Sequence, residues 1–386
     1  EKTSYAQKYP WIVEANLPRS KEFWIDVSKK FKDHNIMWVE TDNLCDVLGR
    51  GGLEGVGEKE KWLIDVIEGF GEYNIPVQMC MTPSILYPVA LKTKNAYFVR
   101  TGDDFRMDSD TFYVYQNFFN TALAWAFGLY PCFDAFFSSE KSYVECDKIK
   151  TEEWGLPIPY ITLAKSNLIF EVLAHALSCG VIYIGDGIGL MDKEMIMRLC
   201  LSNGELIRSD SPAIPIKGCY FEDPLKELYP LVVYTKLKNF ILIGTFNLSH
   251  QEERYSIPLK ETGADGECYS FEYFSREVKM VDKEISDAIQ PNRCKLYILC
   301  PNWDGFSVIG DLDKFITPYI IDDAKRIESE FLVNIDAFDL VKLGIICEER
   351  PREIIVDDTV WKDWNYKDKI VEISLGPGKH TVYIKP

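Results

Sequence analysis

The chain has 386 residues, of which 47% are apolar and 27% are charged, and its net charge is −17. This composition is ordinary for a folded protein of two or three domains. The acidic surface would repel nucleic acid and anionic membranes, so we expect neither as a partner. Eleven cysteines without a CxxC pair and four scattered histidines indicate a reducing compartment and no structural metal. The absence of a visible signal peptide or membrane-spanning helix predicts a cytoplasmic protein.

Between residues 36 and 184, short apolar runs alternate with segments of helical periodicity, which predicts parallel βαβ units. Five strands would serve an open sheet, whereas a closed barrel needs eight. No GxGxxG motif follows the first strand, which disfavours a dinucleotide-binding fold. The predicted strands are Ile36–Thr41, Val77–Met81, Tyr97–Thr101, Leu129–Phe136 and Val181–Ile184, and the predicted helices are Ser20–Lys32, Glu58–Phe70, Thr111–Phe127, Leu163–Ser178 and Lys193–Leu201.

After about Pro212 the pattern changes to short apolar runs separated by Gly, Pro, Asn and Asp. Long helical patterns are nearly absent there, which predicts a C-terminal antiparallel β-sandwich. We therefore expect an α/β domain over residues 1–212 and a β-sandwich domain over residues 213–386.

Acidic residues lie at or near the ends of four of the predicted strands in the α/β region: Asp42, the pair Asp103 and Asp104, Asp134, and Asp186. A single polar residue after a strand is usually a helix cap or a solvated group. Four acidic strand ends in one series instead indicate a catalytic rim, because β/α barrels carry their chemistry at the carboxyl ends of their strands. Arg100 ends one of these strands and is suited to a two-pronged hydrogen bond with a carboxylate or a sugar. Adjacent aspartates repel each other, which suits one of them to holding a proton.

The segments around these residues resemble motifs of glycoside hydrolase family 36, of the raffinose synthase and seed-imbibition type that includes archaeal α-galactosidases. The resemblance is dense from about residue 36 to residue 246 and thin afterwards. The matching segments, in chain order, are Val39–Asn43, Cys80–Met81, Arg100–Phe105, Cys132–Phe136, Tyr183–Asp186, Asn203–Arg208, Phe221–Leu225 and Trp303–Gly310.

The resemblance implies a (β/α)8-type barrel, of which strands four to eight are present, followed by the β-sandwich. It implies a retaining glycosidase that acts on α-galactosides or related sugars, with Asp42 as nucleophile and no cofactor or metal. The acid/base would be Asp104, with Asp103 as the close alternative. The residues expected to bind substrate are Arg100, Glu40, Asp134, Asp186 and Trp38.

The chain departs from the family pattern at two points. The family has lysine two residues before the nucleophile, whereas this chain has Glu40, and the reversed charge is expected to change sugar preference, pH optimum or activity. The family barrel also has three strands before the nucleophile strand, and only 35 residues precede Ile36 here. We therefore hypothesise a fragment, a processed product or one subunit of a split enzyme, whose missing front a second chain would supply.

Two other functions remain open at this stage. A galactosyltransferase would pass the same glycosyl group to a sugar acceptor instead of water. A catalytically silent carbohydrate-binding or regulatory subunit would bind sugar without turnover, and the substitution by Glu40 supports it.

Overall fold

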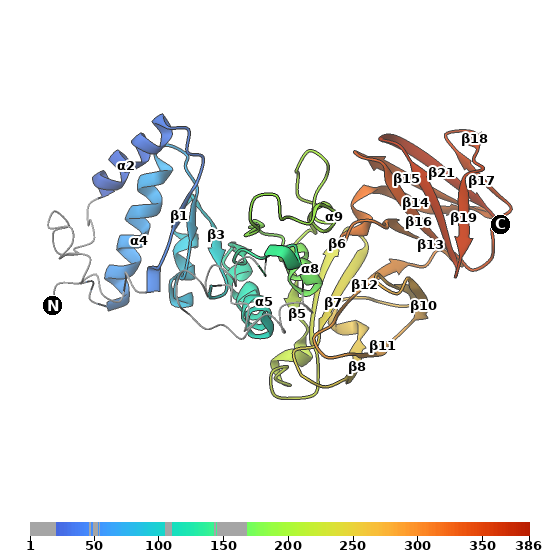
Figure 1. Cartoon of the computed structure of the whole chain (residues 1–386), viewed down its shortest axis with the longest axis horizontal. Coiled ribbons are helices and arrows are strands. Elements are labelled where there is room, and N and C mark those ends of the chain that lie inside the picture. The colour runs from blue at the N-terminus through green and yellow to red at the C-terminus, as the bar shows by residue number, and fades with distance from the viewer. Residues whose placement is uncertain are drawn as a thin grey trace. The chain divides into compact units, whose positions relative to one another are not determined.

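A computed structural model of the chain describes residues 21–45, 48, 53, 55–104, 110–142, 144 and 168–386 (Figure 1). The chain divides into two compact units, one formed by Glu1–Asp104 and Asn120–Asp134, the other by Phe105–Phe119 and Ala135–Pro386. The division into domains at residue 212 stays a prediction.

The first unit is built on a parallel sheet with the strand order β1-β2-β3-β4. All three strand pairs are parallel, as expected for strands that alternate with helices. Its elements are α2 (Lys21–Asp33), β1 (Val39–Thr41), α4 (Gly55–Gly71), β2 (Val77–Met79), the 3-10 helix η1 (Ser84–Leu91), β3 (Ala96–Arg100), the C-terminal end of α5 (Asp110–Ala126) and β4 (Tyr130–Cys132).

One face of this sheet is covered by α2 and α4, which lie side by side (Figure 1). The apolar stripe predicted on α4 packs against the sheet, and complete burial of one large apolar side chain is worth about 1.5–3 kcal/mol. This apolar core determines which side chains of each strand face the helices. Its members include Trp62, Leu63, Val66, Ile67 and Phe70 of α4, Val77, Met79 and Val99 of the sheet, and Trp24, Val27 and Phe31 of α2.

On the opposite face of the sheet, side chains form rows across the strands, because neighbouring strands are in register and side chains alternate along each strand. Glu40 pairs with Gln78, and Gln78 pairs with Phe98. Two residues further along each strand, at the carboxyl end of the sheet, lie Asp42, Cys80 and Arg100. The register of the sheet therefore brings together three residues that are far apart in sequence.

The second unit consists mainly of antiparallel β-structure, and the predicted order of a parallel α/β region before antiparallel sheets is confirmed. Among the described residues the strand orders are β10-β9-β12-β7-β6-β5, β11-β8, β13-β16-β20-β19 and β14-β15-β21-β17-β18 (Figure 1). The strands are β5 (Ile214–Pro215), β6 (Leu231–Leu237), β7 (Phe240–Phe246), β8 (Glu253–Pro258), β9 (Cys268–Glu272), β10 (Glu277–Val281), β11 (Glu284–Ile289), β12 (Cys294–Pro301), β13 (Phe306–Asp311), β14 (Ile321–Ile327), β15 (Glu330–Ala337), β16 (Val341–Cys347), β17 (Glu353–Val356), β18 (Thr359–Val360), β19 (Trp364–Lys367), β20 (Ile370–Leu375) and β21 (Gly378–Lys385).

The start of the second unit differs from the sequence prediction in two places. The predicted strand Val181–Ile184 forms a single parallel bridge, from Ile184 to Phe136. The last predicted helix ends early, so that α9 spans only Lys193–Met197. It ends there because the following backbone pairs with a later segment through the bridge between Cys200 and Leu206. The helix α8 (Leu168–Ser178) ends where predicted, and residues 163–167 of that prediction lie outside the described residues.

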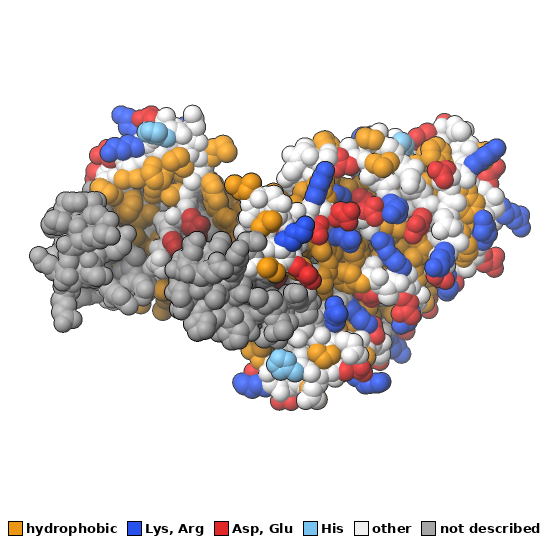
Figure 2. Space-filling view, viewed as in Figure 1, with side chains coloured by type: hydrophobic (Ala, Val, Ile, Leu, Met, Phe, Trp, Pro, Cys, Tyr) orange, Lys and Arg blue, Asp and Glu red, His pale blue; other side chains and the backbone are white. Residues whose placement is uncertain are grey.

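Among the described helices, none is long and apolar enough to cross a membrane. On the face drawn in Figure 2, basic and acidic side chains are interspersed over the β-strand region.

Gly69 sets how closely α2 approaches α4. A Cβ atom at this position would collide with the Cβ atom of Trp24 and come within 3.1 Å of its backbone carbonyl carbon. We expect Gly69→Ala to destabilise the chain by about 1–3 kcal/mol, the usual range for overpacking, in urea unfolding. The matched control is Gly57→Ala in the same helix, which meets nothing within 4 Å and should be neutral or slightly stabilising. Equal effects of the two substitutions would contradict this account.

Candidate active site

Asp42 directly follows β1, at the carboxyl end of the parallel sheet. Its carboxylate accepts hydrogen bonds from the Asn43 backbone N–H at 2.6 Å and from the Asn43 side-chain amide at 3.3 Å. Asn43 has a φ of 55°, in the left-handed region that asparagine tolerates better than most residues. The chain therefore turns immediately after Asp42, and two Asn43 donors hold its carboxylate at the end of the strand.

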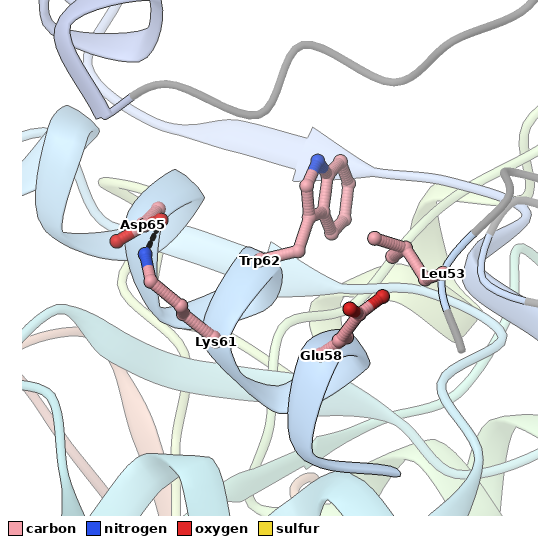
Figure 3. A pocket seen from close by; sticks show the side chains of 5 residues that line it. All are labelled: Leu53, Glu58, Lys61, Trp62 and Asp65. Carbon is pink, nitrogen blue, oxygen red and sulfur yellow. Dashed lines mark hydrogen bonds and ion pairs between the residues drawn. The ribbon is translucent and has the colours of Figure 1, made fainter. Parts of the chain in front are cut away.

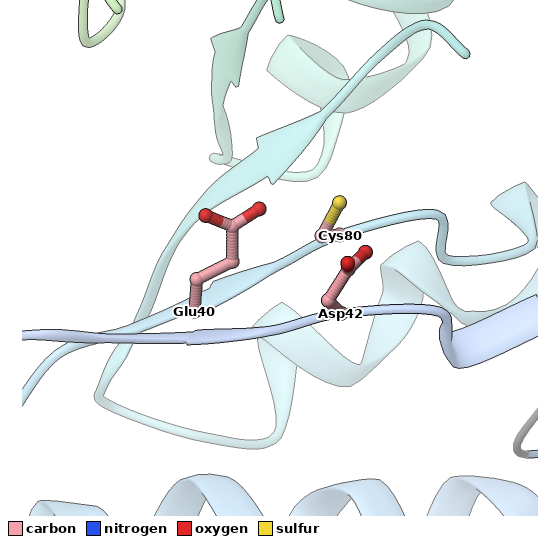
Figure 4. Close-up of side chains that lie close together, drawn as sticks. All are labelled: Glu40, Asp42 and Cys80. Carbon is pink, nitrogen blue, oxygen red and sulfur yellow. The ribbon is translucent and has the colours of Figure 1, made fainter. Parts of the chain in front are cut away.

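Glu40, Asp42 and Cys80 point to the same side of the sheet (Figure 4). One carboxylate oxygen of Glu40, one of Asp42 and the Sγ atom of Cys80 all lie within 4.8 Å of one another. Hydrogen bonding from the Cys80 thiol is the largest effect on Asp42 and lowers its pKa. Burial, the next largest effect, opposes this, and the Asn43 N–H and the positive charge of Arg100 lower the pKa further. Asp42 is thus held as a carboxylate, the form that a nucleophile requires.

Cys80 is completely buried. Burial, and next the neighbouring Asp42 carboxylate, raise the pKa of this thiol. The three residues are close enough to surround a metal ion, but the ligand that cysteine offers to metals is the thiolate. A thiol that keeps its proton fits a hydrogen-bond donor better, and we assign no metal to this group.

Arg100 joins the ends of β3 and β4. Its guanidinium pairs with Asp104, lies 3.3 Å from an Asp134 carboxylate oxygen and donates from Nε to the Gly102 carbonyl at 3.2 Å. The Arg100 side chain is only 7% exposed, so it depends on these partners in place of water. Burial opposes the charged form, but the Asp104 hydrogen bond and the Asp134 charge raise the pKa of Arg100, which stays charged.

Asp103 and Asp104 lie on the loop after β3, and both are exposed. Asp104 is held by the arginine four residues earlier, while its side chain is 67% exposed. The structure thus brings Arg100, Asp104 and Asp134 into direct contact. These contacts do not decide which of the two aspartates is the acid/base. The assignment to Asp104, with Asp103 as the alternative, stays a prediction.

Trp38 precedes β1 and lies, by strand alternation, on the same face as Glu40 and Asp42. Its ring packs edge-on against Phe98, with 6.4 Å between the ring centroids. Trp38 is half-buried, two residues before Glu40 and further from the carboxyl end of the strand. Its predicted part in sugar binding is not tested by this packing contact.

Asp186 lies in the second unit and has a local set of partners. Its carboxylate accepts from the Ser138 backbone N–H at 2.9 Å, from the Ser139 hydroxyl at 3.4 Å and from the Ser142 hydroxyl. These hydrogen bonds tie the segment after Ile184 to the serine-rich turn that follows Phe136. They give Asp186 a structural role, and its predicted place in the sugar subsite stays a prediction.

Cys80 is the residue at this site to which sequence reasoning assigned no role. A signal was present, because Val77–Met81 is a predicted strand and Cys80 stands near its carboxyl end. That position makes it the strand neighbour of Asp42 once the two strands pair in parallel register.

A cavity of about 180 Å³ lies beside α4 and is lined by Leu53, Glu58, Lys61, Trp62 and Asp65 (Figure 3). Lys61 and Asp65 pair with each other at 2.5 Å across one helical turn. Ligand pockets usually hold about 300–1,000 Å³, so this cavity is small, and none of the predicted site residues lines it. We do not treat it as the active site.

Residues 165–287 match the sequence profile of a family described as raffinose synthase or seed imbibition protein Sip1. The chain is 35% identical over 79 residues to probable galactinol–sucrose galactosyltransferase 5 of Arabidopsis thaliana, covering 20% of this chain and 10% of that protein. It is 22% identical over 251 residues to the galactinol–sucrose galactosyltransferase of Pisum sativum, covering 55% of this chain and 31% of that protein. The chain thus matches less than a third of the length of either relative. These matches confirm the predicted family resemblance. The part of the chain that matches the profile includes Asp186 but none of the acidic residues of the first unit.

Two solved structures share the fold. One is a glycoside hydrolase family 27 β-L-arabinopyranosidase from Geobacillus stearothermophilus, with a TM-score of 0.51, 14% identity, and coverage of 73% of this chain and 61% of that chain. The other is alpha-galactosidase I from Mortierella vinacea, with a TM-score of 0.50, 10% identity, and coverage of 73% of this chain and 72% of that chain. These likenesses and the order of sheets confirm the predicted fold class.

We expect Arg100→Met to lower the free energy of unfolding by roughly 2–3 kcal/mol. Breaking a buried ion pair usually costs about 3–5 kcal/mol, and the exposure of Asp104 reduces this figure. Urea unfolding of the full chain measures the effect. The control is Lys92→Met, which removes a more exposed pair with Glu60 and should cost less than about 1 kcal/mol. A loss at Arg100 no larger than the loss at Lys92 would show that the network does not hold the strand ends.

Proposed function

We propose that this chain, a relative of the raffinose synthase and seed imbibition proteins, carries out a retaining reaction on α-galactosides with Asp42 as the nucleophile. The observation that carries the proposal is the state of Asp42 at the carboxyl end of the parallel sheet. Donors from Cys80 and Asn43 favour its ionised form, while Arg100 adds positive charge nearby. Glycosidases that retain configuration require a carboxylate of this kind opposite a second carboxyl group.

In the proposed first step, an Asp42 oxygen attacks the anomeric carbon while the bond to the leaving-group oxygen breaks. Asp104, or else Asp103, gives its proton to that oxygen. In the second step the same carboxylate takes a proton from an incoming hydroxyl group, which displaces Asp42 from the sugar and restores the enzyme. Both steps need only these carboxyl groups, so the proposal includes no metal or organic cofactor.

Arg100 is the residue proposed to keep the second carboxyl group in place. It already holds Asp104 and Asp134 at the ends of neighbouring strands. Its remaining N–H groups are suited to a sugar hydroxyl, and Asp134, Glu40 and Trp38 would complete the contacts to the glycosyl group.

Water and a sugar hydroxyl are both candidates for the incoming group. The relatives named as galactosyltransferases favour transfer to a sugar acceptor. The name of the alpha-galactosidase structure points to hydrolysis, but the likeness of this chain to that structure is one of fold alone. Product analysis with an α-galactoside donor and an excess of sucrose distinguishes a transferred galactose from a released one.

A silent carbohydrate-binding subunit is the second candidate, and the closeness of Glu40 to Asp42 favours it. Two carboxylates this close repel each other, which opposes an arrangement built for an ionised nucleophile. This candidate predicts saturable binding of galactosides without product. Intact mass and subunit composition of the native protein show whether a second chain accompanies this one.

We expect Asp42→Asn to lower turnover of p-nitrophenyl α-galactoside by on the order of 10⁴-fold or more, because an amide cannot form the glycosyl-enzyme intermediate. The assay uses the full chain together with any subunit that copurifies with it. Asp104→Asn should impair natural galactosides more than this activated substrate, whose leaving group needs little protonation. If Asp103→Asn shows that selectivity instead, the acid/base is Asp103. Unchanged turnover in Asp42→Asn would overturn the proposed nucleophile.

We expect Glu40→Gln to move the acidic limb of the kcat/KM profile to lower pH. Removing a negative charge beside Asp42 favours ionisation of that carboxyl group. Glu40→Lys should move the limb further in the same direction and change the ratio of activities on α-galactoside and β-L-arabinopyranoside substrates. The control is Glu60→Gln, which removes a carboxylate that pairs with Lys92. A limb that stays in place in both Glu40 variants would show that this carboxylate does not act on Asp42.

A further inference from the structure

We propose that Cys80 is a positioning residue, whose thiol donates a hydrogen bond to the Asp42 carboxylate and holds it in the orientation for attack. The inference rests on the proposed function of Asp42. It adds a role for a buried cysteine to a site otherwise built from carboxylates and an arginine.

The backbone around Cys80 is locked to the backbone around Asp42. The Cys80 N–H donates to the Thr41 carbonyl at 2.9 Å, and the Cys45 N–H donates to the Met81 carbonyl at 2.8 Å. The two strand ends are thereby tied together on both sides of Asp42. A thiol on one strand therefore faces the carboxylate on the other at a position set by main-chain hydrogen bonds and not by loop mobility.

The residue that follows each of the two has a positive φ. Asn43, directly after Asp42, has a φ of 55°, and Met81, directly after Cys80, has a φ of 51°. A left-handed conformation is uncommon outside glycine, and for methionine it costs free energy that the surrounding contacts must offset. The backbone of both strands thus leaves the sheet immediately after these two residues. Asp42 and Cys80 therefore lie at the carboxyl edge of the sheet.

The chemistry of the three side chains determines which of them donates. Glu40 and Asp42 accept hydrogen bonds when ionised, and Cys80 is the group among the three that carries a proton to donate. Burial and the adjacent carboxylates oppose loss of that proton. Together with the two donors of Asn43, the thiol gives the Asp42 carboxylate three donors, which is enough to define the direction of its lone pairs.

The test compares Cys80→Ala, which removes the donor, with Cys80→Ser, which restores a hydroxyl donor. In Cys80→Ala the acidic limb of kcat/KM should move to higher pH, and kcat should fall by roughly tenfold or more. Misplacement of a catalytic group by about 1 Å can cost on the order of 10²-fold. Cys80→Ser should return the limb toward its original position. If the limb of Cys80→Ala coincides with that of the unmodified chain, the inference is wrong.

Cys132→Ala is the matched control for loss of a buried thiol. Cys132 is completely buried, ends β4 and pairs with Arg100 in the sheet register. Its loss should reduce stability by an amount similar to Cys80→Ala without moving the acidic limb. Equal shifts of the acidic limb in both variants would show that Cys80 acts through packing and not through a hydrogen bond to Asp42. If activity disappears on treatment with EDTA and returns with a divalent cation, Cys80 belongs to a metal site, and the proposed hydrogen bond is wrong.

A second measurement does not depend on turnover. Because the pKa of Asp42 is lowered in the folded chain, its ionisation stabilises the fold above the unfolded pKa, and this contribution is lost as pH falls through the folded pKa. The stability difference between the full chain and Asp42→Asn should therefore shrink between about pH 5 and pH 2. In the Cys80→Ala background the difference at pH 7 should be smaller.

The two measurements separate failure of this inference from failure of the proposed function. A chain without turnover on any α-galactoside that still shows the coupling of Cys80 to Asp42 would refute the function and keep the hydrogen bond. A chain with turnover that depends on Asp42 but shows no coupling would refute the role of Cys80.

Discussion

The register of the four-stranded parallel sheet is the constraint on which the candidate site depends. It places Asp42, Cys80 and Arg100 in one row at the carboxyl end, on the face opposite the apolar core under α4. A shift of one residue in any strand would turn its side chain in this row toward that core. The same register that buries Val77 and Met79 thus aligns a carboxylate, a thiol and a guanidinium on the other face.

The carboxylates near Asp42, Cys80 and Arg100 lie in two kinds of environment. Asp42 accepts hydrogen bonds from neutral donors, Cys80 and Asn43, whereas Asp104 and Asp134 are held by the charged Arg100. Enzymes that use two carboxyl groups for different tasks distinguish them by their surroundings. The buried guanidinium also influences Asp42 through its charge, so the two environments are electrostatically coupled. A change at Arg100 therefore affects Asp42, Asp104 and Asp134 together.

The comparisons and the site geometry support the proposal from different parts of the chain. The family profile covers residues 165–287, from the end of the α/β region into the antiparallel sheets. The proposed nucleophile and its neighbours lie before that range. Glu40 stands where the motif that the segment resembles has lysine, and one of its carboxylate oxygens lies within 4.8 Å of an Asp42 oxygen.

Local signals in the sequence determined the helix α4, the parallel order of the early strands and the antiparallel character of the region after residue 212. Helical periodicity and short apolar runs are properties of neighbouring residues, so they can be recognised without a partner. Tertiary structure alone decided that Val181–Ile184 forms one bridge, because pairing requires a second strand in reach. It also decided that Asp186 binds Ser138 and that Cys80 faces Asp42, since hydrogen bonds between distant segments depend on register and not on local pattern.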